Sequence, residues 1–179
     1  MKGIVFTGFL ELVEDKYGLE MVDEIITNSN LESKGIYTSV GTYSFYEMLQ
    51  LISNLSKFTN ICADDLLLVY GEHFFSILLR SYPDLIKRYT DPIELLSSIG
   101  NHIHVEVKKI YPEAKLPRFE VLEKSSNSLI MIYKSSRAMH HFGLGLMNKT
   151  FEYFNSTANI ILEQIKDDGT EIKFIISKN

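Results

Sequence analysis

The sequence predicts an α+β fold, in which an N-terminal helical subdomain precedes a subdomain with a small antiparallel sheet and a helix packed on it. Apolar residues recur with the period of a helix through roughly the first two thirds of the chain. Two pairs of short apolar segments with polar turns then follow, and a further helical segment separates the pairs. The order helices, hairpin, helix, hairpin is typical of this fold class.

The helical part divides into six expected helices, at about residues 2–17, 19–29, 44–58, 63–80, 82–88 and 92–111. Asp64 and Asp65 suit the positive N-terminal end of the fourth helix, and Pro92 is well placed to open the sixth. Strands are expected at 118–123 and 128–133 around the turn "KSSN", and at "NIILEQI" and "EIKFIIS" around "KDDG". A helix at about 137–154 separates the two hairpins.

The length and composition favour one domain over residues 1–179, with 45% hydrophobic residues to build its core. The loop at 30–43 is the expected seam between a helical subdomain of about residues 1–60 and a second subdomain of about 61–179. The net charge of -5 and the pI near 5.5 give no basic patch, so neither nucleic acid nor an anionic membrane surface is an expected partner.

The expected location is the cytoplasm. The single cysteine, Cys62, cannot form an internal disulfide, and the N-terminal segment turns acidic at Glu11 without a cleavage site for a signal peptide. No apolar run is long enough to span a bilayer, which favours a soluble protein. No catalytic constellation stands out, so we do not expect an enzyme.

Two histidines in "SIGNHIHVEVKKIYPEAKLPRF" are separated by helical periodicity. The core-facing stripe of this predicted helix is Leu95, Ile99, Ile103, Val107 and Ile110. His102 then lies on a solvated face, whereas His104 lies about 100° from Ile103, with Gly100 one turn before it. A neutral imidazole with space beside it is able to bind a metal, but a hydrogen-bonded structural histidine fits these facts as well.

The segment "YKSSR", residues 133–137, falls where a strand ends and a helix begins. Hydroxyls, free backbone N–H groups and an Arg fork meet there, which suits a carboxylate or a phosphate. A simple helix N-cap with an exposed arginine remains the alternative. The adjacent His140 and His141 point about 100° apart and cannot chelate one ion from a regular helix.

Together these segments resemble the H-NOX family, the heme nitric oxide/oxygen binding domains similar to the heme domain of soluble guanylate cyclase. "MKGIVFTGFLELVEDKYG" resembles the N-terminal helix of the family, and "GIYTSVGTYSFYEML" resembles the loop after it. "HVEVKKIYPEAKLPRF" looks like the helix that carries the iron ligand, and "YKSSR" matches the signature Y-x-S-x-R. The likeness runs through nearly the whole chain.

The resemblance implies a b-type heme with His104 as the axial iron ligand. It implies that Tyr133, Ser135 and Arg137 bind the heme propionates. Pro117 takes the position whose ring distorts the porphyrin, and Gly100 is expected against the heme face on the histidine side. Some bacterial relatives hold zinc near the C-terminus, but no Cys or His stands there in this chain, so no zinc is expected.

The resemblance also implies which gas is bound. Oxygen-binding members place a tyrosine five residues after the signature arginine, where this chain has Phe142, and the other two polar positions align with Phe9 and Phe74. The expected distal pocket, on the side opposite His104, is Val5, Phe9, Phe74, Phe75, Leu78, Phe142 and Leu146. Since none of these donates a hydrogen bond, we expect a nitric oxide (NO) sensor that discriminates against O2 and also binds CO. An inward swing of His140 or His141 is the one way to add a donor there.

In the mechanism that the resemblance implies, NO weakens the iron–His104 bond, and the porphyrin then relaxes against Pro117 and shifts the N-terminal subdomain. The signalling partner is expected to be a separate histidine kinase or cyclic-di-GMP enzyme. Two alternatives remain: an O2-binding or heme-carrying protein, and a heme-free helical interaction module in which His104 is structural.

Overall fold

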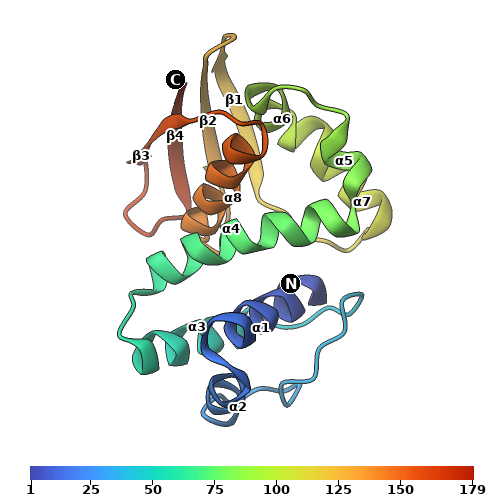
Figure 1. Ribbon diagram of the computed structural model, residues 1–179, viewed down its shortest axis with the longest axis vertical. Coiled ribbons are helices and arrows are strands. Elements are labelled where there is room, and N and C mark those ends of the chain that lie inside the picture. Colours follow the sequence, from blue (N-terminus) through green and yellow to red (C-terminus); the bar gives the residue numbers. More distant parts are fainter.

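A computed structural model describes residues 1–179 and contains helices followed by a sheet with one more helix against it (Figure 1). The α-helices are α1 (Gly3–Tyr17), α2 (Leu19–Thr27), α3 (Phe45–Thr59), α4 (Ala63–Ser81), α5 (Pro83–Lys87), α6 (Pro92–Ser97), α7 (His104–Ile110) and α8 (His140–Tyr153). The strands are β1 (Arg118–Lys124), β2 (Ser128–Lys134), β3 (Ala158–Gln164) and β4 (Glu171–Lys178). The predicted α+β class is confirmed. No helix is both long and apolar enough to cross a membrane.

The N-terminal helices α1, α2 and α3 form one group, which lies below α4 in Figure 1. The loop between α2 and α3 is held by the buried carboxylate of Glu47, which accepts hydrogen bonds from the Ser33 and Tyr37 hydroxyls. Lys2 and Thr42 form a β-bridge, which brings this loop back to the start of α1. The loop at 30–43 is therefore anchored to the N-terminal helices, and its role as a seam between subdomains stays a prediction.

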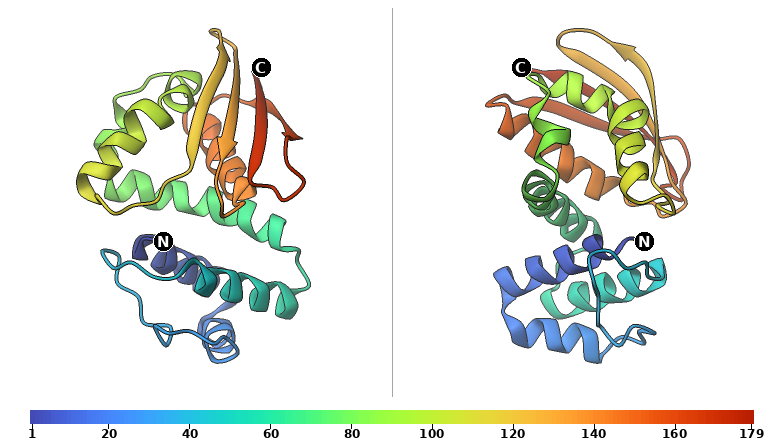
Figure 2. Two further views of the ribbon diagram at one scale, coloured as in Figure 1. Left: turned by 180° about the vertical axis from the view of Figure 1, so that it is seen from behind. Right: turned by 90° about the vertical axis from the view of Figure 1, so that its right-hand side faces the viewer.

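Helix α4 lies between the N-terminal helices and the sheet, as both views in Figure 2 show. Its N-cap is Cys62, whose sulfur accepts a hydrogen bond from the Asp65 N–H at 3.4 Å. Buried α4 residues contribute to two separate hydrophobic cores, Tyr70 to the core of the N-terminal helices and Phe75 to the core under the sheet. Because α4 contributes side chains to both cores, it belongs to neither subdomain alone. The expected boundary between the two subdomains at about residue 60 stays a prediction.

The predicted helix at 92–111 is wrong in one respect, because the structure breaks it into α6, a π-helical turn at Ile99–Ile103 and α7. Ile103 N–H bonds the Ser98 carbonyl and His104 N–H bonds the Ile99 carbonyl, each five residues back. The wider turn inserts an extra residue immediately before His104. A sequence pattern with the ordinary helical period does not reveal such an insertion.

The predicted helix at 137–154 also begins later than expected, at His140. Ala138 adopts a left-handed backbone conformation with φ 50°, and the Ser135 hydroxyl accepts from the Arg137 N–H at 3.2 Å. Residues 135–139 are therefore a turn that leads from β2 into α8.

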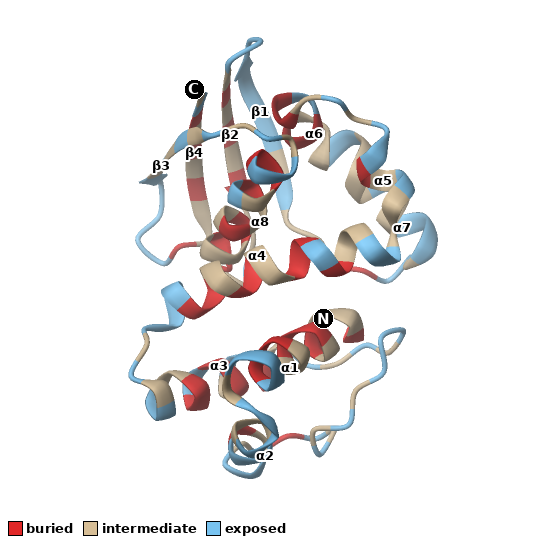
Figure 3. Cartoon of the chain, viewed as in Figure 1, coloured by how far each residue is buried: buried red, intermediate tan, exposed pale blue.

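The four strands form one antiparallel sheet in the order β1-β2-β4-β3, so the two predicted hairpins pair through β2 and β4. Alternate residues of β2 and β4 are buried, including Met131 and Phe174, and they pack on Met147 and Phe151 of α8. Strand β1, by contrast, is largely exposed (Figure 3). The expected helix on a small sheet is confirmed.

Candidate functional site

A large apolar cavity lies where the start of α1, the helices α4, α7 and α8 and the beginning of β1 come together. Its volume is about 630 Å³, inside the range of small-molecule and cofactor sites. Of its 36 lining residues 25 are hydrophobic. Such a lining suits a large apolar molecule that keeps a few polar groups at its edge.

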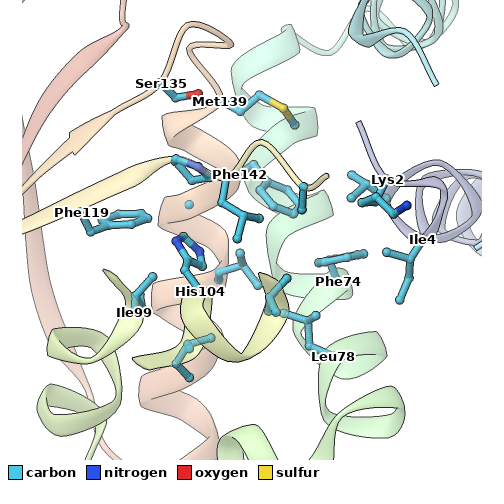
Figure 4. A pocket seen from close by; sticks show the side chains of 18 of the residues that line it. Lys2, Ile4, Phe74, Leu78, Ile99, His104, Phe119, Ser135, Met139 and Phe142 are labelled. Carbon is cyan, nitrogen blue, oxygen red and sulfur yellow. The ribbon is translucent and has the colours of Figure 1, made fainter. Parts of the chain in front are cut away.

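His104 enters this cavity from the first position of α7 (Figure 4). The ring contacts Phe119 with centroids 5.8 Å apart, and the nearby backbone carbonyl of Pro117 favours the protonated form of the ring. Burial lowers the pKa of His104 from 6.5 to about 4. The imidazole is therefore neutral at pH 7, and one of its nitrogens keeps a lone pair for a metal. Metal-binding histidines usually donate their other ring N–H to such a carbonyl, which fixes the orientation of the ring.

His102 lies outside the cavity lining. Its Nε2 is 2.7 Å from Arg88 Nη1, and its Nδ1 is 2.5 Å from the Tyr89 hydroxyl. Because arginine only donates, Nε2 must accept, and Nδ1 then donates to Tyr89. The expectation of a solvated His102 needs correction, because the ring is partly buried between two partners that no periodicity argument could name.

Tyr133, Ser135 and Arg137 all line the cavity at the end of β2 and in the turn after it. The buried Tyr133 hydroxyl accepts from the Met139 N–H at 3.0 Å, which leaves its own proton free to donate. Burial raises the pKa of Tyr133 and lowers that of Arg137. Arg137 Nη1 donates to the Lys115 carbonyl at 2.6 Å.

Two further basic residues, Lys2 and Lys115, line the same cavity and were missed in the sequence. Lys2 Nζ donates to the Val40 carbonyl at 2.8 Å and lies 4.8 Å from the centre of the Tyr111 ring. Nothing in their local sequence distinguishes them from exposed lysines, since only the fold brings residues 2 and 115 together with 137.

Pro117 lines the cavity as expected, but Gly100 does not. A Cβ at Gly100 would lie 2.7 Å from the carbonyl oxygen of Phe119. The glycine therefore allows the π-helical turn to approach β1, and the structure places Gly100 against β1 and outside the cavity lining. The inserted π-helical residue redirects this turn in a way that a regular helix would not.

Six of the seven expected distal residues line the cavity: Val5, Phe74, Phe75, Leu78, Phe142 and Leu146. Phe9 does not, although it shares a face of α1 with Val5. It is fully buried and packs on Tyr70, with ring centroids 5.3 Å apart. The structure therefore places Phe9 in the hydrophobic core of the N-terminal helices and outside the cavity lining.

Tyr70 is the residue near the distal side that sequence reasoning missed. Its ring lies 4.9 Å from Phe142 and 5.7 Å from Phe74, measured between centroids. Its hydroxyl is not free, because it donates to the Val5 carbonyl and so ties α4 to α1. Neither His140 nor His141 lines the cavity.

Comparison with known proteins agrees with this geometry. A family model described as Haem-NO-binding matches residues 2–162. The Fe(II) unliganded H-NOX protein from K. algicida is 72% identical with a TM-score of 0.97, and the similarity covers 100% of this chain and 97% of that one. The H-NOX from Shewanella woodyi in the Fe(II)CO ligation state is 37% identical with a TM-score of 0.84, over 100% of this chain and 95% of that one.

The soluble guanylate cyclase gcy-33 of Caenorhabditis elegans is 25% identical over 142 residues, which are 76% of this chain but 14% of the cyclase. The likeness to the cyclase is thus confined to a small part of that protein. The family match covers most of this chain. The chain belongs to the H-NOX family of heme-based gas sensors, and the resemblance found in the sequence is confirmed.

Proposed function

We propose that this protein senses NO through a b-type heme whose axial ligand is His104, and that it discriminates against O2. The observation that carries the proposal is a neutral histidine in an apolar cavity in which none of the six expected distal residues has a side-chain hydrogen-bond donor. The residues present fit a heme, because the cavity offers one metal-binding nitrogen, an apolar lining and a basic edge.

A ferrous heme in this cavity would supply an iron atom that binds His104 on one side and a diatomic gas on the other. Tyr133, Ser135 and Arg137 would hold its two carboxylates by charge-assisted hydrogen bonds at the cavity edge. Pro117 would have two roles, because it lines the cavity and its carbonyl would accept the second ring N–H of an iron-bound His104.

The distal lining supports the choice of gas. Bound O2 gains negative charge, and a hydrogen bond to it is worth about 1.5–3 kcal/mol. Phe74 and Phe142, whose centroids lie 5.4 Å apart, offer no such bond. The Tyr82 and Tyr111 hydroxyls also lie on the cavity and bond each other at 2.6 Å, but Tyr82 is about 12 Å beyond Phe74 along α4. NO binds without a donor, and the Shewanella woodyi relative supports CO as a second gas.

The signal would pass through contacts that already exist. Ile4 and Val5 reach the cavity from α1, and Tyr70 ties Val5 to α4, so a change inside the cavity acts directly on the N-terminal helices. We propose that these helices shift and that a separate cytoplasmic histidine kinase or cyclic-di-GMP enzyme reads the shift, with no catalysis by this chain itself. A pull-down with and without NO tests the partner.

The test of heme ligation is a pair of matched variants, His104→Ala and His102→Ala. We expect His104→Ala to lose the ferrous five-coordinate histidine spectrum and to recover it with added imidazole, while His102→Ala keeps it. A His104→Ala variant that binds heme and NO as the wild type does would contradict ligation by His104, and a wild type that takes up no heme would favour the heme-free module.

A further inference from the structure

A second cluster of metal-binding side chains lies outside the cavity, where α1 and α4 pack together. It consists of Glu11 and Asp15, one helical turn apart on α1, and His73 on α4. One ligand atom from each residue lies within 4.8 Å of the other two. None of the three lines the cavity, so the proposed heme site does not explain them.

The histidine of this cluster has a nitrogen without a partner. His73 Nε2 is shielded from solvent and makes no hydrogen bond. Its nearest acidic neighbour is Glu11 Oε1 at 3.9 Å, which is too long for a hydrogen bond. A buried polar atom without a partner is unfavourable and rare, and an ion that the nitrogen binds would satisfy it.

The donor set points to one class of metal. Zinc accepts both imidazole nitrogen and carboxylate oxygen as ligands, and three protein ligands leave a fourth position for water, whereas calcium and magnesium prefer oxygen alone. Arg80 Nη2 donates to both carboxylate oxygens of Glu11, at 3.1 and 3.3 Å. The two carboxylates of the cluster carry two negative charges and Arg80 carries one positive charge, so a net negative charge remains to attract a cation. Zinc would need ligand atoms about 3.3 Å apart. Because the Asp15 side chain is exposed, it can rotate to bring its carboxylate from the observed separation of up to 4.8 Å to that shorter distance.

We propose that Glu11, Asp15 and His73 bind one zinc ion, which links the N-terminal helix to α4. The ion stabilises the folded protein, since the three ligands come together only when α1 packs on α4. This site does not depend on heme or on any gas.

The experiment uses the purified full chain after chelator treatment, titrated with Zn²⁺ by calorimetry. We expect one equivalent to bind and the melting temperature to rise. His73→Ala should weaken binding at least 100-fold and Asp15→Asn at least tenfold. His141→Ala is the matched control, because His141 also lies next to a carboxylate, with Nδ1 3.2 Å from Asp64, and it should bind zinc normally.

A crystal grown with zinc should show anomalous scattering about 2.0–2.1 Å from His73 Nε2. Absence of stoichiometric binding in the wild type would overturn the proposal, as would binding that survives both His73→Ala and Asp15→Asn. If His73→Ala does not fold, the exposed Asp15→Asn variant decides the question by itself.

Discussion

Phe142 occupies the position in the cavity where a single hydroxyl would most change gas selectivity. It lines the cavity and contacts Phe74 and Tyr70. We predict that Phe142→Tyr adds a donor for bound O2 and raises O2 affinity roughly ten- to a hundredfold. Absorption titration of the reduced protein with O2 measures the change.

The control is Tyr70→Phe, which removes the hydroxyl nearest to the distal aromatic rings. Since that hydroxyl is engaged with the Val5 carbonyl, gas affinity should not change, while stability should fall by about 0.5–1.5 kcal/mol. An altered gas response in Tyr70→Phe would mean that its hydroxyl reaches the ligand, contrary to this account.

His140 should make the protein sensitive to acid. Its ring is buried against Gly169, its Nδ1 has no partner, and burial, followed by the neighbouring His141, lowers its pKa. The unfolded chain therefore binds the proton first, so stability is complete above pH ~6.5 and falls as the pH drops below it. We predict that His140→Gln makes the loss of stability between pH 7.5 and 5.5 smaller. Urea unfolding at both pH values measures it, and an unchanged loss would show that His140 is not responsible.

At the scale of elements, the crossing of α4 and α8 sets the shape of the cavity, since both helices carry residues of its lining. The two backbones touch at this crossing, where a Cβ at Gly145 would lie 2.0 Å from the Leu68 carbonyl oxygen. Two residues earlier on α8, a Cβ at Gly143 would have no atom within 4 Å.

We predict that Gly145→Ala destabilises the heme-free protein by about 1–3 kcal/mol, because two helix backbones must separate. Gly143→Ala should be neutral or stabilise it by up to about 1 kcal/mol, because alanine favours the helix. Denaturant unfolding of the two variants gives the comparison. Equal effects would contradict the close backbone contact seen at Gly145.

The same scale shows what limits prediction from sequence. Periodicity placed the helices and hairpins, because their faces alternate between core and solvent. It failed at two places. Before His104 the helix contains a π-helical turn, in which the hydrogen bonds span five residues, and at Ala138 the backbone turns into a left-handed conformation. Gly100 was recognised as a residue that leaves space, but its neighbour is the β1 backbone, which only the fold brings there.

For the whole molecule, the sequence predicted the fold class, and most of the residues that it singled out for the site line the cavity, His104 among them. The site residues of short motifs such as "YKSSR" could be predicted because they are adjacent in the chain. Lys2 and Lys115 could not be predicted, since they reach the cavity from distant segments of the chain through packing alone. The contact of Phe9 with Tyr70, which keeps Phe9 in the core of the N-terminal helices, could not be predicted for the same reason.

The central claim is that the protein binds NO at a ferrous heme and offers no hydrogen bond that would stabilise bound O2. The most direct test is the absorption spectrum of the reduced, heme-loaded protein, first equilibrated with air and then with NO without oxygen. We expect the spectrum in air to stay that of the unliganded ferrous protein and NO to convert it completely. A stable oxy complex in air would contradict the account.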